Sequence, residues 1–128
     1  MFFIENLIYL DFEYLQDDVK ERFHLICCSI YDCSKMGIFN FDLRSSFEEL
    51  KSYLHSLDLK ATIFVGYNIS GAEVPCLCQI MGRQWVLKSK WIDLWTEFKM
   101  FSLTHTKYRS NTTGLSECIS ALGVVDQY

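Results

Sequence analysis

Three strand-like segments follow one another near the start of the chain, joined by short connections. They cover residues 7–14, 24–32 and 38–43, and a polar turn ending at Gly37 separates the second from the third. Connections this short join neighbouring antiparallel strands, because a parallel pair needs a crossover of about a dozen residues or more. The sequence therefore predicts an antiparallel meander of three strands.

The remaining sequence alternates between helical and strand-like segments. Ser46 and Glu49 fit a capping box, and apolar residues then recur at helical spacing up to Leu57. Residues 61–66 form an apolar run typical of a strand buried on both faces. The other expected elements are a helix over residues 72–81, a short strand or strand–helix junction over 91–95 that continues as helix to 101, a polar loop over 102–113 and a last helix over 114–122.

This order of elements, β-β-β-α-β-α-β-α, indicates an α/β fold with a mixed sheet covered by helices. It resembles the order of the ribonuclease H-like (RNase H-like) fold. No repeat and no linker rich in Gly, Ser or Pro divides residues 1–128. One domain is therefore expected.

Composition limits the classes of function. Half of the residues are hydrophobic, which is enough for a core, and the net charge of −4 excludes a strongly basic nucleic-acid surface. A nuclease built on carboxylates remains compatible with this charge, because bound metal supplies the positive charge. No signal peptide is recognised in residues 1–10, and no apolar run reaches the ~20 residues of a membrane helix. We expect a cytoplasmic protein without membrane contact.

The cysteines do not indicate a zinc site. Six occur in the chain: Cys27, Cys28, Cys33, Cys76, Cys78 and Cys118. The first two are adjacent and the pair near residue 77 is two apart, so neither pair has the C-x-x-C spacing of a zinc knuckle. We expect reduced thiols that serve as small apolar residues.

Asp11 and Glu13 interrupt the first strand-like segment. Side chains two residues apart on a strand point the same way, so both carboxylates should lie on one face at the end of this strand. Oxygen ligands of this kind suit Mg²⁺ or Mn²⁺. The alternative is an edge strand with a solvated face, and the two-residue pattern alone does not decide between them.

A second carboxylate position follows the buried strand at residues 61–66. The chain turns through Tyr67 and Asn68, and Glu73 then stands at the top of the next helix. In this order of elements that position can face the first strand, which would make Glu73 a third metal ligand. The alternative is a glutamate that only favours the positive end of the helix dipole.

Together, these segments resemble the proofreading exonuclease region of phage-type family A DNA polymerases, which belong to the DEDD (DnaQ-like) 3′–5′ exonucleases. The matching stretches lie within residues 7–123 and are Asp-Phe-Glu-Tyr (11–14), Gly-Tyr-Asn-Ile-Ser-Gly-Ala-Glu (66–73) and Trp-Ile-Asp-Leu-Trp-Thr-Glu-Phe-Lys (91–99). Glu73 stands where most of the family carries Asp, and the family's third motif, a Tyr or His followed by Asp, is not found.

The resemblance implies metal-dependent hydrolysis at the 3′ end of single-stranded DNA, with two Mg²⁺ or Mn²⁺ ions. Asp11, Glu13 and Glu73 would be the catalytic and metal-binding residues, and Tyr67 and Asn68 would contact the substrate. Without the third motif the domain would be incomplete, which implies a separate polymerase subunit or a homodimer as partner. The alternative is an RNase H-like module that has lost catalysis and binds DNA ends or docks on a polymerase.

Other residues have simpler interpretations. Asp93 is expected to cap the turn after its strand. Trp91 and Trp95 are expected to share a helix face in the core rather than stack on bases, and the nearby basic residues to be solvated.

Overall fold

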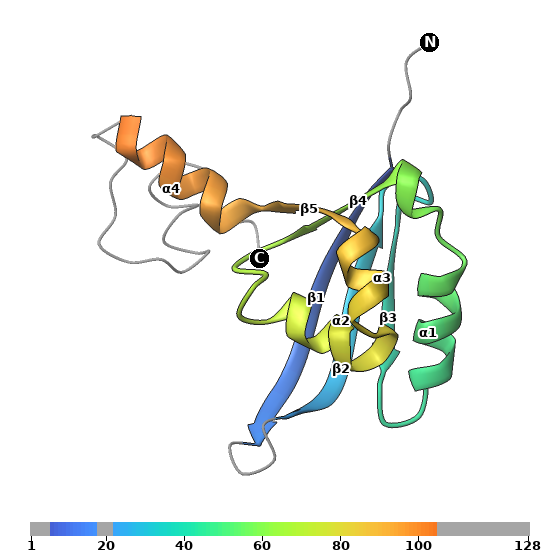
Figure 1. The fold of residues 1–128 in the computed structure, drawn as a ribbon. Helices are drawn as coiled ribbons and strands as arrows, with labels where there is room; N and C mark the ends of the chain where they lie inside the picture. Colours follow the sequence, from blue (N-terminus) through green and yellow to red (C-terminus); the bar gives the residue numbers. More distant parts are fainter. Residues whose placement is uncertain (1–5, 18–21, 105–128) are drawn as a thin grey trace.

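The protein forms a mixed five-stranded sheet, seen in a computed structural model that describes residues 6–17 and 22–104 (Figure 1). The strands are β1 (Asn6–Asp17), β2 (Arg22–Asp32), β3 (Gly37–Asp42), β4 (Thr62–Gly66) and β5 (Lys90–Asp93). Their order across the sheet is β3-β2-β1-β4-β5. The expected meander is confirmed, since β1 to β3 pair antiparallel, and β4 and β5 add parallel strands on the other side of β1.

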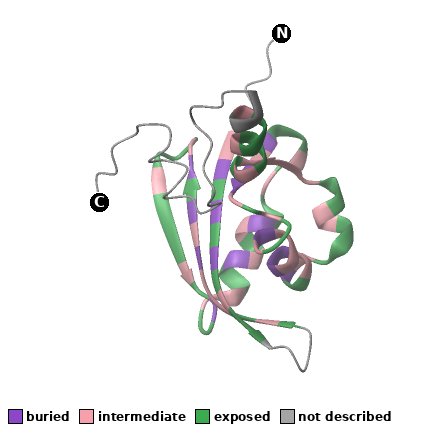
Figure 2. Ribbon diagram, turned by 90° about the vertical axis from the view of Figure 1, so that its left-hand side faces the viewer, coloured by how far each residue is buried: buried purple, intermediate pink, exposed green. Residues whose placement is uncertain are grey.

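The described helices are α1 (Phe47–His55), α2 (Glu73–Met81), α3 (Arg83–Lys88) and α4 (Leu94–Thr104), with a 3₁₀ turn at Leu59–Ala61. Figure 2 shows the sheet at one side with helices packed against a single face of it. In Figure 1, α4 leads away from the end of β5, on the side opposite to α1. Helices were expected to cover the sheet, and in the described part of the chain they cover one of its two faces.

Alternation along β1 explains which face the helices cover. Ile8, Leu10 and Phe12 are buried, whereas Asp11 and Glu13 between and beyond them are exposed. Successive strand residues point to opposite faces, so the apolar set packs against the helices and the carboxylates project from the other face. The same alternation continues in β2, where Cys28 and Ile30 lie in the core.

Buried side chains from the sheet and from α1 and α2 form one core between them. Phe64 of β4 is fully buried and stacks on Trp91 of β5, with ring centroids 5.1 Å apart. Leu50 and Leu54 of α1 are fully buried, as the helical spacing predicts. No described helix is long and apolar enough to cross a membrane.

Four sequence-based expectations need correction. Asp11 and Glu13 lie within β1 rather than at its end, because the strand continues to Asp17 after an irregularity in its pairing with β2. The helix α3 was not expected, and α4 reaches Thr104, beyond the start of the expected loop. Trp91 belongs to β5 and Trp95 to α4, so they do not share a helix face. The expected last helix, residues 114–122, lies outside the described residues.

The described cysteines are free thiols, as expected. Cys28 and Cys76 are fully buried in the core, and burial raises the pKa of both thiols. Both side chains therefore stay protonated and serve as small apolar groups. Cys118 lies outside the described residues.

The β2–β3 turn is fixed by a buried carboxylate. Asp32 is only 2% exposed and accepts hydrogen bonds from Asn6 Nδ2 at 2.9 Å, Ser34 Oγ at 2.6 Å and Tyr53 Oη at 2.8 Å. Burial by itself raises the pKa of Asp32, but these bonds outweigh it and lower the pKa to about 2. The network ties β1, the turn and α1 together.

We predict that Asp32→Ala lowers the free energy of unfolding by about 2–3 kcal/mol, because it removes a buried acceptor that three side-chain donors share. The folded pKa of Asp32 lies below its ordinary value of 3.8, so its contribution is present above that pH and is lost as pH falls toward about 2. Urea unfolding measures the effect. Asp42→Ala is the control, since Asp42 is an exposed carboxylate paired with Arg44. Equal losses for both variants would contradict the role of the network.

Candidate functional site

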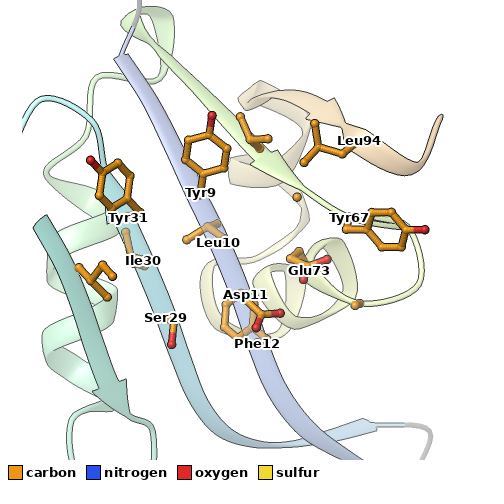
Figure 3. Close-up of a pocket in the computed structure, with 14 residues that line it drawn as sticks. Tyr9, Leu10, Asp11, Phe12, Ser29, Ile30, Tyr31, Tyr67, Glu73 and Leu94 are labelled. Carbon is orange, nitrogen blue, oxygen red and sulfur yellow. The ribbon is translucent and has the colours of Figure 1, made fainter. Parts of the chain in front are cut away.

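A cavity of about 620 Å³ opens on the sheet face that carries Asp11 (Figure 3). Its walls come from β1, β2, β3 and β4 and from the starts of α2 and α4. The lining residues are Tyr9, Leu10, Asp11, Phe12, Ser29, Ile30, Tyr31, Ile38, Val65, Gly66, Tyr67, Ala72, Glu73 and Leu94. The cavity is within the size range of small-molecule and nucleotide sites.

Glu73 is the most unusual polar residue of this cavity. It begins α2 and is only 3% exposed, and its Oε2 atom has no hydrogen-bond partner in the described part of the chain. Burial is the main cause that raises its pKa to about 7, and the charges of Asp11 and Asp93 add to this. A buried oxygen without a partner costs free energy that a proton or a cation would recover.

Asp11 lies beside Glu73 at one end of the cavity. Figure 3 shows the two carboxylates as neighbours, one from the middle of β1 and the other from the first turn of α2. Burial raises the pKa of Asp11 above its ordinary value, and the charge of Glu13 adds to this. Two carboxylates forced together in this way disfavour simultaneous ionisation unless a cation lies between them.

The structure brings some of the expected site residues together and not others. Asp11, Glu73 and Tyr67 line the cavity, whereas Glu13 and Asn68 do not. Glu13 is exposed on the same strand as Asp11, just before the pairing irregularity of β1. Within residues 6–17 and 22–104, no three His, Cys, Asp or Glu side chains already form a group arranged to hold a metal ion.

The donor chemistry nevertheless suits a hard divalent cation. Glu73 offers an unpaired carboxylate oxygen, and Asp11 offers a second carboxylate beside it. Mg²⁺ is bound in proteins by one or two carboxylates together with water and substrate phosphate. Asp11 and Glu73 are ligands of the type that such an ion takes.

Asp93 fixes the loop that delivers Glu73. Its Oδ1 accepts hydrogen bonds from the backbone amides of Asn68 at 2.8 Å and Trp95 at 3.0 Å, and its Oδ2 accepts one from Ile69 at 3.3 Å. The expected role as a cap after the strand is confirmed by the bond to Trp95. The bonds to the loop extend that role, because they join the start of α4 to the turn before α2.

Gly66 permits the close approach of Glu73 to the sheet. A Cβ atom at this position would lie 2.6 Å from Ile69 Cγ2 and 3.7 Å from Glu73 Cδ. The first distance is a steric clash, so a side chain here would push the turn away from β4. The turn also needs Asn68 in the left-handed region, with φ of 53°, which Asn tolerates better than most residues.

Tyr9 and Tyr31 are cavity residues that the sequence reasoning missed. Tyr9 stands two positions before Asp11 on β1, so strand alternation alone places it on the same face. Tyr31 is its direct partner on β2, and only the strand register reveals this. Trp91, in contrast, packs in the core, and Trp95 lies under the Lys99 ammonium at 3.7 Å from its ring centroid.

Comparison with known proteins adds no assignment. No protein-family model matches the chain, and no curated protein matches it significantly.

We predict that the free energy of unfolding falls by about 3 kcal/mol as pH rises from 4.5 through about 7, in the absence of divalent cations. The folded pKa of Glu73 lies above its ordinary value, so stability is full at low pH and is lost as the carboxyl ionises. Glu73→Gln should remove this decline. Urea unfolding across this pH range measures it, with Glu49→Gln on the exposed side of α1 as control. An unchanged pH slope in Glu73→Gln would contradict the assignment.

We also predict that Asp93→Ala speeds hydrogen exchange at the Asn68 and Ile69 amides by about tenfold to a hundredfold, because both lose a charged acceptor. Exchange followed by NMR measures this. Asp58→Ala is the control, since Asp58 accepts a bond from the Lys60 amide elsewhere in the fold. Exchange rates that stay the same in Asp93→Ala would show that the carboxylate does not hold the loop.

Proposed function

We propose that the chain is an RNase H-like 3′–5′ exonuclease domain that binds Mg²⁺ or Mn²⁺ and removes nucleotides from DNA 3′ ends. Asp11 and Glu73 are the central ligands. Glu13 is the third ligand, and Tyr67 and Asn68 contact the substrate. The observation that carries the proposal is the unpaired, buried Oε2 of Glu73 beside the carboxylate of Asp11.

The architecture supports the proposal. Three antiparallel strands are followed by parallel strands that alternate with helices, which is the chain order of the RNase H-like fold. Asp11 lies on the central strand of the sheet, and Glu73 lies at the start of the helix that follows β4. Residues 11–14 and 66–73, two of the three stretches that carry the resemblance to DEDD exonucleases, thus both contribute to the cavity.

A bound divalent cation supplies charge that draws in a phosphodiester and lowers the pKa of an attacking water. The protein's own part is to hold that cation and to shape its surroundings. Asp11 and Glu73 would hold it from two different elements, so the site depends on the packing of α2 against β1. Glu73 would give up its proton on binding the cation, because a carboxyl ligand must be deprotonated.

A DNA-binding module without hydrolysis is the second candidate. It is favoured by the position of Glu13, which lies outside the cavity and leaves two carboxylates, Asp11 and Glu73, in its described lining. Such a module would bind DNA ends or dock on a separate polymerase subunit or a second copy of the chain. The two candidates differ in one measurement, the release of nucleotides.

We predict that the wild-type protein binds Mn²⁺ in calorimetry and trims 3′-labelled single-stranded DNA in its presence. Asp11→Ala and Glu73→Gln should each lower the trimming rate at least about a hundredfold, because each removes a central ligand. Glu13→Ala should have a smaller effect.

Glu49→Ala on α1 is the control and should keep wild-type metal affinity and rate. Metal and DNA binding without release of nucleotides would favour the module that has lost catalysis. The proposed function is wrong if the wild-type protein neither binds metal nor trims DNA.

A further inference from the structure

Two tyrosines form a half-exposed aromatic surface within the cavity. Tyr9 of β1 and Tyr31 of β2 are direct cross-strand partners, and their ring centroids lie 6.2 Å apart at an angle of 59°. Tyr9 is 41% exposed and Tyr31 is 38% exposed. Figure 3 shows the two rings on neighbouring strands, on the sheet face that carries Asp11.

The cavity has a polar end and an apolar end. Asp11 and Glu73 are the charged residues of its described lining, and both stand on the side of α2. The tyrosine rings lie away from these acids, and the lining also includes the apolar residues Ile38, Val65 and Leu94. A ligand that fills such a cavity needs a cation-binding group at one end and a flat, weakly polar group at the other.

A nucleotide has these two parts joined at a fixed separation. Its phosphate is a ligand for a cation held by carboxylates, and its base is a flat group that stacks on aromatic rings. Asp11 lies two residues beyond Tyr9 on the same strand face, so the two ends of the cavity are about one nucleotide apart. A nucleotide therefore fits the cavity in both chemistry and spacing.

We infer that Tyr9 and Tyr31 form a stacking site for an unpaired base next to the phosphate that the carboxylates and their cation engage. The inference rests on the proposed function and names the part of the substrate that occupies the apolar end. Stacking on an aromatic ring accepts every base, so the site has little sequence preference. It requires an unpaired base, because a base inside a duplex has no free face to offer.

The test compares substitutions that remove the aromatic ring of each tyrosine with substitutions that keep the ring and remove only the hydroxyl group. Tyr9→Leu and Tyr31→Leu should each raise the KM for single-stranded DNA about tenfold and leave kcat within about twofold. Tyr9→Phe and Tyr31→Phe keep the ring and should keep the wild-type KM. Phe39→Leu is the matched control, because Phe39 is 37% exposed but lies against Tyr53 of α1, on the helix-covered face.

A substrate with an abasic 3′-terminal residue completes the test. Wild type should show a KM raised about tenfold for this substrate, and Tyr9→Leu should show no further increase, because the lost partner is the same. Thermal unfolding and sedimentation of each variant identify a structural role. A fall in melting temperature or a changed oligomeric state with an unchanged KM would overturn the inference, since the rings would then support the fold or a contact between copies.

The outcomes separate this inference from the proposed function. If the protein trims DNA and neither tyrosine substitution changes the KM, the stacking site is wrong and the exonuclease proposal stands. If the wild-type protein neither trims DNA nor binds metal, the exonuclease proposal is wrong. In that case the stacking site is tested by anisotropy of a labelled single strand, and it fails if Tyr9→Leu binds as tightly as wild type.

Discussion

The pairing of β1 on both sides is the constraint on which the rest of the structure depends. β1 pairs antiparallel with β2 and parallel with β4, so its register is fixed by two neighbours at once. A slip of one residue against either neighbour would bring Asp11 into the core and expose Leu10 and Phe12. The burial of that apolar set therefore keeps the carboxylate on the open face. The same alternation places Tyr9 beside it, so one register creates both ends of the cavity.

The second half of the site depends on the turn between β4 and α2. This turn must bring a glutamate to the sheet closely enough to bury it, which Gly66 allows by having no side chain. Asp93 then fixes the turn through the amides of Asn68 and Ile69, although its negative charge also raises the pKa of Glu73. Asp11 and Asp93 thus both lie near Glu73. The bonds from Asp93 stabilise the turn, but its charge destabilises the ionised state of Glu73. An arrangement of this kind is common at functional sites, because a ligand recovers the cost.

Sequence patterns predict which helices and strands this protein forms better than they predict where each one begins and ends. The alternation in residues 7–14 and the helical spacing after Ser46 reflect burial, and burial determined both elements in the structure. The end of β1 is different, because Gln16 and Asp17 carry no apolar signal and are strand only through pairing with β2. The sequence places Glu73 in the first turn of a helix, but its burial depends on contacts between α2 and β1 that no local pattern encodes. Tyr31 was missed for the same reason, since only the register joins it to Tyr9.

The charge of the cavity determines what each of its two ends contributes to binding. Its described lining contains carboxylates and no cationic side chain, so a phosphate that approaches without a cation meets only repulsion. The proposed stacking of a base on the tyrosine rings does not depend on that charge, so it would hold a strand near the acidic end while the cation is absent. Once a cation neutralises Asp11 and Glu73, attraction at the phosphate adds to stacking at the base. The affinity for a single strand should therefore depend on metal at one end of the cavity and on aromatic rings at the other, and each contribution should persist when the other is removed.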